Sequence, residues 1–117
     1  MTWSVDQLKE LSVAYGEAVE SNTLGFSAFS QLQPWQLLPS GEIFDVAEQW
    51  PSAGATPGKL VAFAVRQDCD DIACFELDQR RVSRVLLIEG WSEGSYTAFG
   101  EFQTFTDWLN AAKRRDI

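Results

Sequence analysis

Apolar side chains recur at helical spacing near the N-terminus of the chain. They share one helix face, which comprises Val5, Leu8, Leu11, Tyr15 and Val19. The segment Ser4–Gln7 has the pattern of a capping box, in which the Ser4 hydroxyl accepts the Gln7 amide and the Gln7 side chain reaches back. The sequence therefore predicts an N-terminal helix, whose end is left open because Gly16 weakens the helical pattern.

A second stripe at helical spacing lies near the C-terminus. Its apolar members are Phe105, Trp108, Leu109 and Ala112. Thr104 can cap this helix, Asp107 suits its positive end, and the basic run 113–115 suits its negative end. The sequence predicts a C-terminal helix that begins after Thr104.

The region between residues 26 and 58 gives a mixed signal. Pro34 and Pro39 exclude a long helix, and a short strand is expected near Trp35–Leu38. A second helix is predicted to begin at a Ser40 cap and to end at Pro51. Its apolar face would comprise Ile43, Ala47 and Trp50. Residues 51–58 have the composition of a loop.

The centre of the chain is typical of β-structure. Three apolar runs are predicted as strands, at Leu60–Val65, Ile72–Leu77 and Val82–Ile88. Their connections are short and polar, which implies antiparallel hairpins, since parallel neighbours need a longer crossover. A weaker strand is expected in Tyr96–Phe102. Together the elements predict a single α+β domain over residues 1–117, with an antiparallel sheet.

Composition narrows the class of protein. The chain is 45% hydrophobic, with five Trp and eight Phe, which is enough for a folded core. No apolar run approaches the length of a membrane span and the first residues do not resemble a signal peptide, so a cytoplasmic location is predicted. The formal net charge of −8 disfavours nucleic acid and anionic membrane surfaces as partners. It would attract a basic partner, or it serves solubility alone.

Residues for catalysis are scarce in this sequence. The chain has no His and only two cysteines, Cys69 and Cys74, so zinc, haem and Cys-His chemistry lack their ligands or base. Free thiols, no cofactor and no enzymatic activity are predicted. A carboxylate pair, Glu89 and Glu93 beside Trp91, is a weak pattern for an acid-catalysed hydrolase.

The most conspicuous polar cluster is the run Asp68-Cys69-Asp70-Asp71. It admits three interpretations: a structural turn, an acidic patch that faces a partner, or a site for a hard cation. The spacing of a calcium loop fails, because the twelfth position of such a loop would be Gln79. No metal site is therefore predicted, and the turn and the acidic patch both remain open.

A second candidate for partner contact is the segment around Trp91 and Tyr96. Its composition is that of a loop with two amphipathic aromatic residues, a type favoured in interfaces. The alternative is that Trp91 packs back onto the sheet as part of the core.

The order of these motifs resembles the SUKH superfamily, whose founding members include a fungal regulator of cell-wall assembly. The likeness rests on the segments Gln67–Phe75, Val85–Trp91 and Thr104–Leu109, and it covers residues 60–113. The N-terminal half departs, because it lacks the Asn-Gly or Gly-Gly turn that often follows the first helix of the family.

The resemblance implies a curved antiparallel sheet with the N-terminal and C-terminal helices packed on it. It also implies a protein-binding role shared by many bacterial members, which are immunity proteins that neutralise a cognate toxin. Partner contact is then expected at Asp68, Asp70, Asp71, Trp91, Glu93 and Tyr96. The partner would be a basic toxin domain. The alternative function is a regulatory domain that binds a small ligand or a metal.

Overall fold

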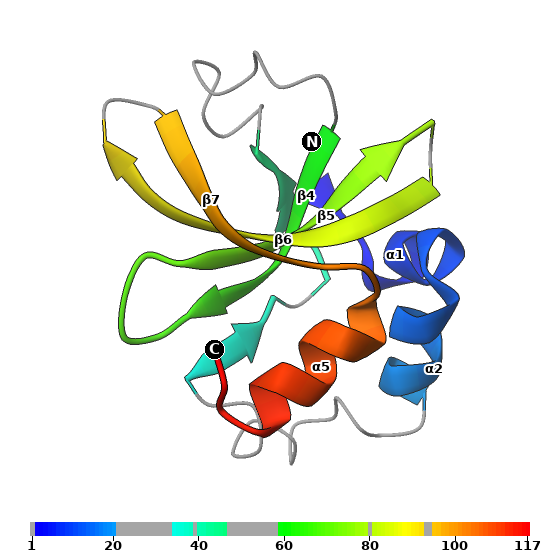
Figure 1. Ribbon diagram of the computed structural model, residues 1–117. Helices are drawn as coiled ribbons and strands as arrows, with labels where there is room; N and C mark the ends of the chain where they lie inside the picture. Colours follow the sequence, from blue (N-terminus) through cyan, green and yellow to red (C-terminus); the bar gives the residue numbers. More distant parts are fainter. Residues whose placement is uncertain (1, 21–33, 39, 47–58, 80, 93–94) are drawn as a thin grey trace.

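One antiparallel sheet organises the fold (Figure 1). The computed structural model describes residues 2–20, 34–38, 40–46, 59–79, 81–92 and 95–117. Within them the strands are β1 (Thr2–Trp3), β2 (Trp35–Leu37), β3 (Ile43–Asp45), β4 (Lys59–Arg66), β5 (Ile72–Asp78), β6 (Arg81–Ser92) and β7 (Ser95–Phe102). The order across the sheet is β1-β3-β4-β5-β6-β7, and β2 also pairs with β4. The predicted antiparallel hairpins are confirmed.

In the described part of the chain, three helices lie on one face of this sheet (Figure 1). They are α1 (Val5–Leu11), α2 (Val13–Glu20) and α5 (Phe105–Lys113). Both predicted caps are present: the Ser4 hydroxyl accepts the Gln7 amide at 3.1 Å, and the Thr104 hydroxyl accepts the Asp107 amide at 3.1 Å. The α+β architecture with helices from both ends of the chain flanking the sheet is therefore confirmed. None of the helices in the described ranges is long and apolar enough to cross a membrane.

The N-terminal helix is divided in two at Ser12. This residue is extended, with φ −137° and ψ 110°, and its amide donates to the Leu8 carbonyl at 2.9 Å. Its hydroxyl accepts the Tyr15 amide at 3.2 Å, as a cap does at the start of a helix. Ser12 thus ends α1 and begins α2, a break that the apolar spacing alone did not indicate.

The helix predicted from Ser40 is wrong over its first residues, because Ile43–Asp45 forms strand β3. Gly41 takes a φ of +90° in the preceding turn, and its amide donates to the Trp3 carbonyl at 3.2 Å. That contact brings the segment beside β1, and β3 then pairs with both β1 and β4. The rest of this prediction, including Ala47 and Trp50, and the predicted loop 51–58 lie outside the described residues.

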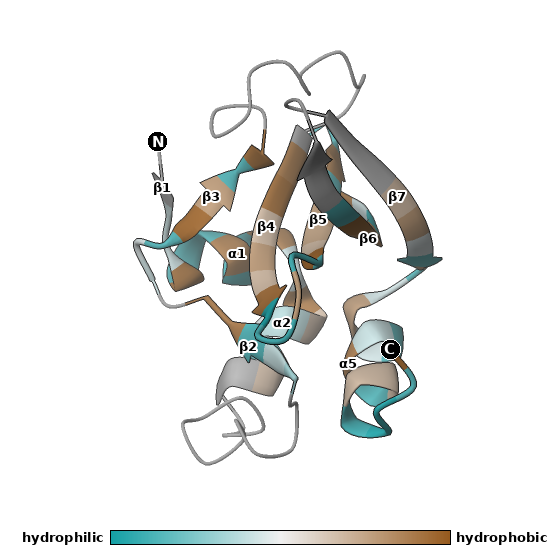
Figure 2. Ribbon diagram, turned by 90° about the vertical axis from the view of Figure 1, so that its left-hand side faces the viewer, coloured by the Kyte–Doolittle hydropathy of each residue, from teal (hydrophilic) through white to brown (hydrophobic). Residues whose placement is uncertain are grey.

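Both faces of the sheet carry buried apolar side chains. Figure 2 shows the hydrophobic residues that run along the strands, most clearly along β4. The face beneath the helices holds an aromatic cluster, which comprises Tyr15, Phe63, Phe75, Phe105 and Trp108. The opposite face holds a smaller cluster that includes Ala62, Cys74, Leu86 and Ile88. A bulge in β4 between Ala62 and Ala64 places Phe63 and Ala64 in the same cluster, despite their adjacency in sequence.

Candidate protein-binding site

The acidic run lies at the tip of the β4–β5 hairpin. The Arg66 amide donates to the Asp71 carbonyl at 3.0 Å and closes the turn. The Gln67 amide donates to the Pro34 carbonyl at 2.9 Å, and the Gln67 side chain donates to the Gln36 side chain at 3.0 Å. These bonds join the turn to the segment that enters β2. The hairpin tip is therefore held by backbone contacts on two sides.

Asp68 is fixed by an ion pair within this turn. The Arg66 Nε donates to Asp68 Oδ1 at 2.7 Å, and Arg66 Nη2 donates to Asp68 Oδ2 at 3.2 Å. The hydrogen bond from Arg66 lowers the pKa of the Asp68 carboxyl, which keeps it ionised. The Arg66 guanidinium in turn lies 6.0 Å from the centre of the buried Trp35 ring. This chain of contacts fixes the direction of the Asp68 carboxylate.

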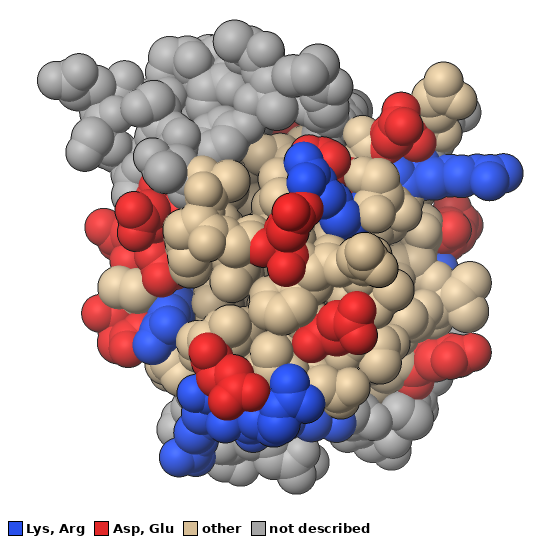
Figure 3. Space-filling model, in the orientation of Figure 1, with Lys and Arg blue, Asp and Glu red and all other residues tan. Residues whose placement is uncertain are grey.

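The other residues of the tip differ in their exposure. Asp70 is exposed and has no ion pair or hydrogen bond to its side chain within the described part of the chain, whereas Asp71 is half-buried. The Asp71 backbone lowers the pKa of the neighbouring Cys69 thiol, but desolvation and the Asp71 and Asp68 side chains raise it overall. A thiol with a raised pKa is a poor nucleophile at neutral pH. Figure 3 shows acidic side chains along the side of the molecule where this turn lies.

Trp91 lies in strand β6, which corrects the loop predicted there, and Tyr96 lies in β7, where a weaker strand was expected. Ser92 pairs with Ser95, so β6 and β7 continue almost to the turn. The pairing passes directly from Glu89↔Thr97 to Ser92↔Ser95, which sets Gly90 and Trp91 of β6 opposite Tyr96 of β7. The two aromatic residues are therefore neighbours across the hairpin. Glu93, the remaining predicted contact residue, lies outside the described residues.

The β4–β5 turn lies at the same end of the sheet as the end of β6 and the start of β7 (Figure 1). Ile72, the first residue of β5, pairs with Val65 on one side and with Ile88 on the other. The acidic turn precedes Ile72, and Trp91 follows Ile88, so both extend beyond this row of residues. The structure thereby brings Asp68, Asp70 and Asp71 to the same end of the sheet as Trp91 and Tyr96.

The other candidate carboxylates and thiols can be placed in the described part of the chain. Glu89, one of the weak carboxylate candidates, lies in strand β6 and is exposed. Across the described ranges, no three side chains from His, Cys, Asp and Glu are grouped so that they could hold a metal. Both cysteines are free, and burial raises the pKa of the Cys74 thiol strongly. What this end presents is a set of fixed and exposed hydrogen-bond acceptors.

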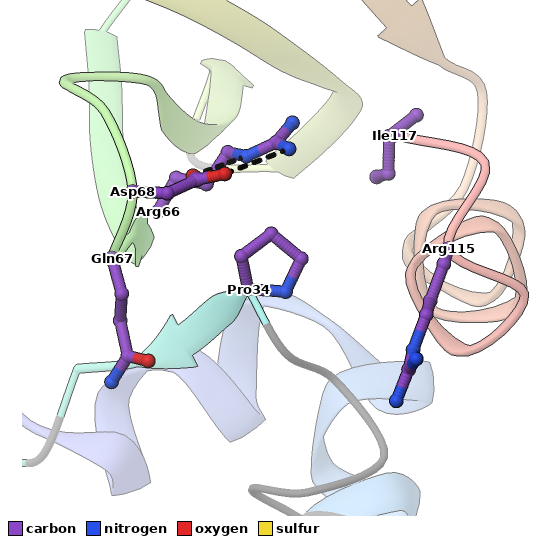
Figure 4. Close-up of a pocket in the computed structure, with 6 residues that line it drawn as sticks. All are labelled: Pro34, Arg66, Gln67, Asp68, Arg115 and Ile117. Atoms are coloured by element: carbon purple, nitrogen blue, oxygen red, sulfur yellow. Dashed lines mark hydrogen bonds and ion pairs between the residues drawn. The ribbon is translucent and has the colours of Figure 1, made fainter.

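A groove beside the acidic turn was missed by the sequence reasoning. It has a volume of about 520 Å³ and opens to solvent. Its described lining residues are Pro34, Arg66, Gln67, Asp68, Arg115 and Ile117 (Figure 4). The run 113–115 was interpreted only as charge at a helix end, and no pattern in the sequence placed Arg115 near Arg66.

Comparisons with known proteins give no match. No protein-family model, curated protein or solved structure matches the chain. The likeness to the SUKH superfamily therefore rests on the three motif segments alone. In the structure these segments lie in the acidic turn and β5, in β6, and at the start of α5.

Proposed function

We propose that this chain is a non-catalytic, cytoplasmic protein-binding module that binds a basic partner through the acidic end of its sheet. The observation that carries the proposal is the fixed β4–β5 tip, where Asp68 is oriented by Arg66 and Asp70 is exposed. The strand pair that contains Trp91 and Tyr96 lies at the same end and would supply apolar contact area.

Charge supports this choice of partner. A carboxylate already held in place loses little conformational freedom when it accepts a hydrogen bond from a Lys or Arg of the partner. The net charge of −8 would also speed the encounter with a basic protein. The acidic end would then set the orientation of docking, and the aromatic pair would contribute to the lifetime of the complex.

The resemblance to SUKH domains supports a more specific role. Bacterial members of that superfamily commonly act as immunity proteins, which neutralise a toxin by covering its functional surface. An acidic module without catalytic groups is suited to mask a basic toxin domain, such as a nuclease or a deaminase. We therefore propose toxin neutralisation as the biological activity of this chain.

A charge-reversal experiment tests the site. The variant Asp68→Lys/Asp70→Lys/Asp71→Lys should capture the cognate partner from native lysate poorly, and its association at low salt should be slower by about tenfold or more. The control variant Glu10→Lys/Glu17→Lys/Glu42→Lys makes the same change in net charge at three exposed positions away from the tip. It should retain most of the association rate. Circular dichroism would verify that both variants are folded.

Two outcomes would contradict the proposal. Equal slowing by the two triple variants would show that only net charge matters and that the hairpin tip is not the contact site. A captured protein that is harmless when expressed alone would refute the neutralising role, even if it binds the acidic tip. Toxicity of the isolated partner, relieved by co-expression of the wild-type chain and not of the tip variant, is the expected result.

A further inference from the structure

The groove beside the acidic turn has the size of a ligand site. Its volume of about 520 Å³ falls within the range of roughly 300–1,000 Å³ found for small-molecule sites. Pro34 lies between two walls: the Arg66–Asp68 ion pair stands on one side, and Arg115 and Ile117 stand on the other (Figure 4). Charged groups thus flank an apolar centre.

Arg115 has an unusual backbone conformation for a residue with a side chain. Its φ is +58°, in the left-handed region that favours glycine. Its amide donates to the Ala112 carbonyl at 3.1 Å, and the next amide, of Asp116, donates to the Ala111 carbonyl at 3.0 Å. This is the hydrogen-bond pattern with which many helices end on a glycine. Arginine is less favoured than glycine at such a position, so the backbone does not explain the choice of residue.

The hydrogen-bond donors of the Arg115 guanidinium are available to a ligand. In the described part of the chain, it makes no hydrogen bond or ion pair, while the adjacent Arg114 is paired with Asp116 at 2.8 Å. On the facing wall Arg66 uses Nε and Nη2 for Asp68, which leaves Nη1 available. The groove thus carries two guanidinium groups, of which only that of Arg66 is paired with a carboxylate side chain among the described residues. Figure 3 shows basic side chains gathered near the end of α5.

We propose that this groove binds a small organic anion, in which a carboxylate or phosphate group is joined to an apolar body. The oxyanion would accept paired hydrogen bonds from the planar guanidinium of Arg115, a geometry that a lysine cannot provide. The apolar body would rest on Pro34 and Ile117, and Arg66 Nη1 would supply a further donor. The site adjoins the proposed protein-binding tip at Asp68 but differs from it in its ligand, since it depends on Arg115 and not on Asp70 and Asp71.

The test uses the full chain and three probes of similar size. Phenyl phosphate and N-benzoylglycine each carry an oxyanion beside a ring, and benzamidine carries a cation in the same position. Nuclear magnetic resonance would follow the Nε–H signals of Arg66 and Arg115 during titration. We expect saturable shifts with both anions at concentrations of about 1 mM, and no saturable shift with benzamidine.

The variant Arg115→Gly removes the guanidinium and also suits the left-handed backbone, so its melting temperature should not fall. It should bind the anions at least about tenfold more weakly than the wild type. The matched control is Arg81→Ala, which removes an exposed guanidinium at the opposite end of the sheet and should leave the affinity unchanged. Asp70→Asn should also leave anion binding unchanged, which separates this site from the protein-binding proposal.

Either of two results would overturn the proposal. One is the absence of saturable shifts in the wild-type chain with both anionic probes. The other is retention of full affinity by Arg115→Gly, which would place the anion elsewhere on the molecule. If only the phosphate or only the carboxylate binds, the site stands and its ligand class narrows to that group.

Discussion

Tyr15 is the residue whose ionisation is most tightly linked to the packing of the core. Its side chain is 2% exposed and meets Phe63, Phe75 and Phe105 edge to face, with ring centres 5.3–6.3 Å apart. Burial disfavours the charged phenolate and raises the pKa of Tyr15 to about 12. The folded chain therefore keeps a proton that the unfolded chain loses at a pKa near 10.

This difference predicts an alkaline loss of stability that depends on Tyr15. The stabilisation is complete below pH 10 and is lost between pH 10 and about 12, at a slope of up to about 1.4 kcal/mol per pH unit. Tyr15→Phe should remove this contribution and flatten the decline in the free energy of unfolding. Urea unfolding at a series of pH values would measure it. Burial also raises the pKa of the Cys74 thiol, but this contribution is the same in the wild type and in Tyr15→Phe. An equal decline of the free energy of unfolding in the two proteins would contradict the prediction.

Single residues were predictable where their partners are close in sequence and the local geometry is standard. The Ser4–Gln7 capping box is such a case, and it is present in full. The Arg66–Asp68 pair is different, because it depends on the path of the β4–β5 turn and on Trp35 beneath it. The left-handed backbone of Arg115 gave no signal in the sequence, since the position usually marked by glycine carries an arginine.

At the scale of elements, the central strands could be predicted from the sequence better than the ends of the helices. Strands β4, β5 and β6 were found because each carries a run of apolar residues between polar turns, whereas β7 gave a weaker signal. The break at Ser12 was missed because Leu8, Leu11 and Tyr15 keep helical spacing across it, so the spacing hides it. Strand β3 was missed because its pairing with β1 and β4 outweighs the local pattern that predicted a helix from Ser40. Gly41, so close after the expected Ser40 cap, was the available warning against a helix there.

The two glycines in these regions should respond to alanine in opposite directions. Gly41 has a φ of +90° and open space around its Cα, so Gly41→Ala should lower the free energy of unfolding by about 1 kcal/mol through backbone strain alone. Gly16 lies within α2, and a methyl group there would meet Lys9 at an ordinary 3.4 Å. Gly16→Ala should therefore stabilise the protein by up to about 1 kcal/mol.

Chemical denaturation at neutral pH would measure both changes, and each variant serves as the control for the other. Unchanged or higher stability of Gly41→Ala would contradict the assignment of strain to Gly41. Loss of stability in Gly16→Ala would instead mean that α1 and α2 cannot accommodate a methyl group between them.

At the scale of the whole molecule, repulsion among like charges should limit stability. The chain carries seventeen acidic and nine basic residues, and the described ion pairs lie at the surface. Salt screens the net repulsion, whereas exposed pairs contribute little that salt could remove. We therefore expect the melting temperature to rise between low salt and about 0.15 M NaCl.

Calorimetry at several salt concentrations would test this, with a neutral osmolyte of equal osmolality as the control. A melting temperature that falls with added salt would show that the ion pairs outweigh the repulsion. Association with a basic partner should change in the opposite direction and weaken as salt is added. The two measurements together separate the effect of charge on folding from its effect on binding.

Only part of the candidate site could be predicted from the sequence, because the fold as a whole brings its residues together. Its acidic residues and its aromatic residues were each found from local composition. Their location at one end of the sheet follows from the alternating direction of successive hairpins, and it became clear only with the pairing of Ile72 between Val65 and Ile88. The groove could not be predicted, because no sequence motif contains both Arg66 and Arg115. They line the same groove only because α5 packs beside the sheet.

The strand order also has a consequence for synthesis on the ribosome. Strands β4 to β7 are consecutive in sequence and pair with their neighbours as they emerge, whereas β1 needs β3, and β3 needs β4. Strand β1 must therefore wait for the middle of the chain to emerge before it can enter the sheet. The helices α1 and α2, of seven and eight residues, are marginal on their own until the aromatic face against which they pack is assembled.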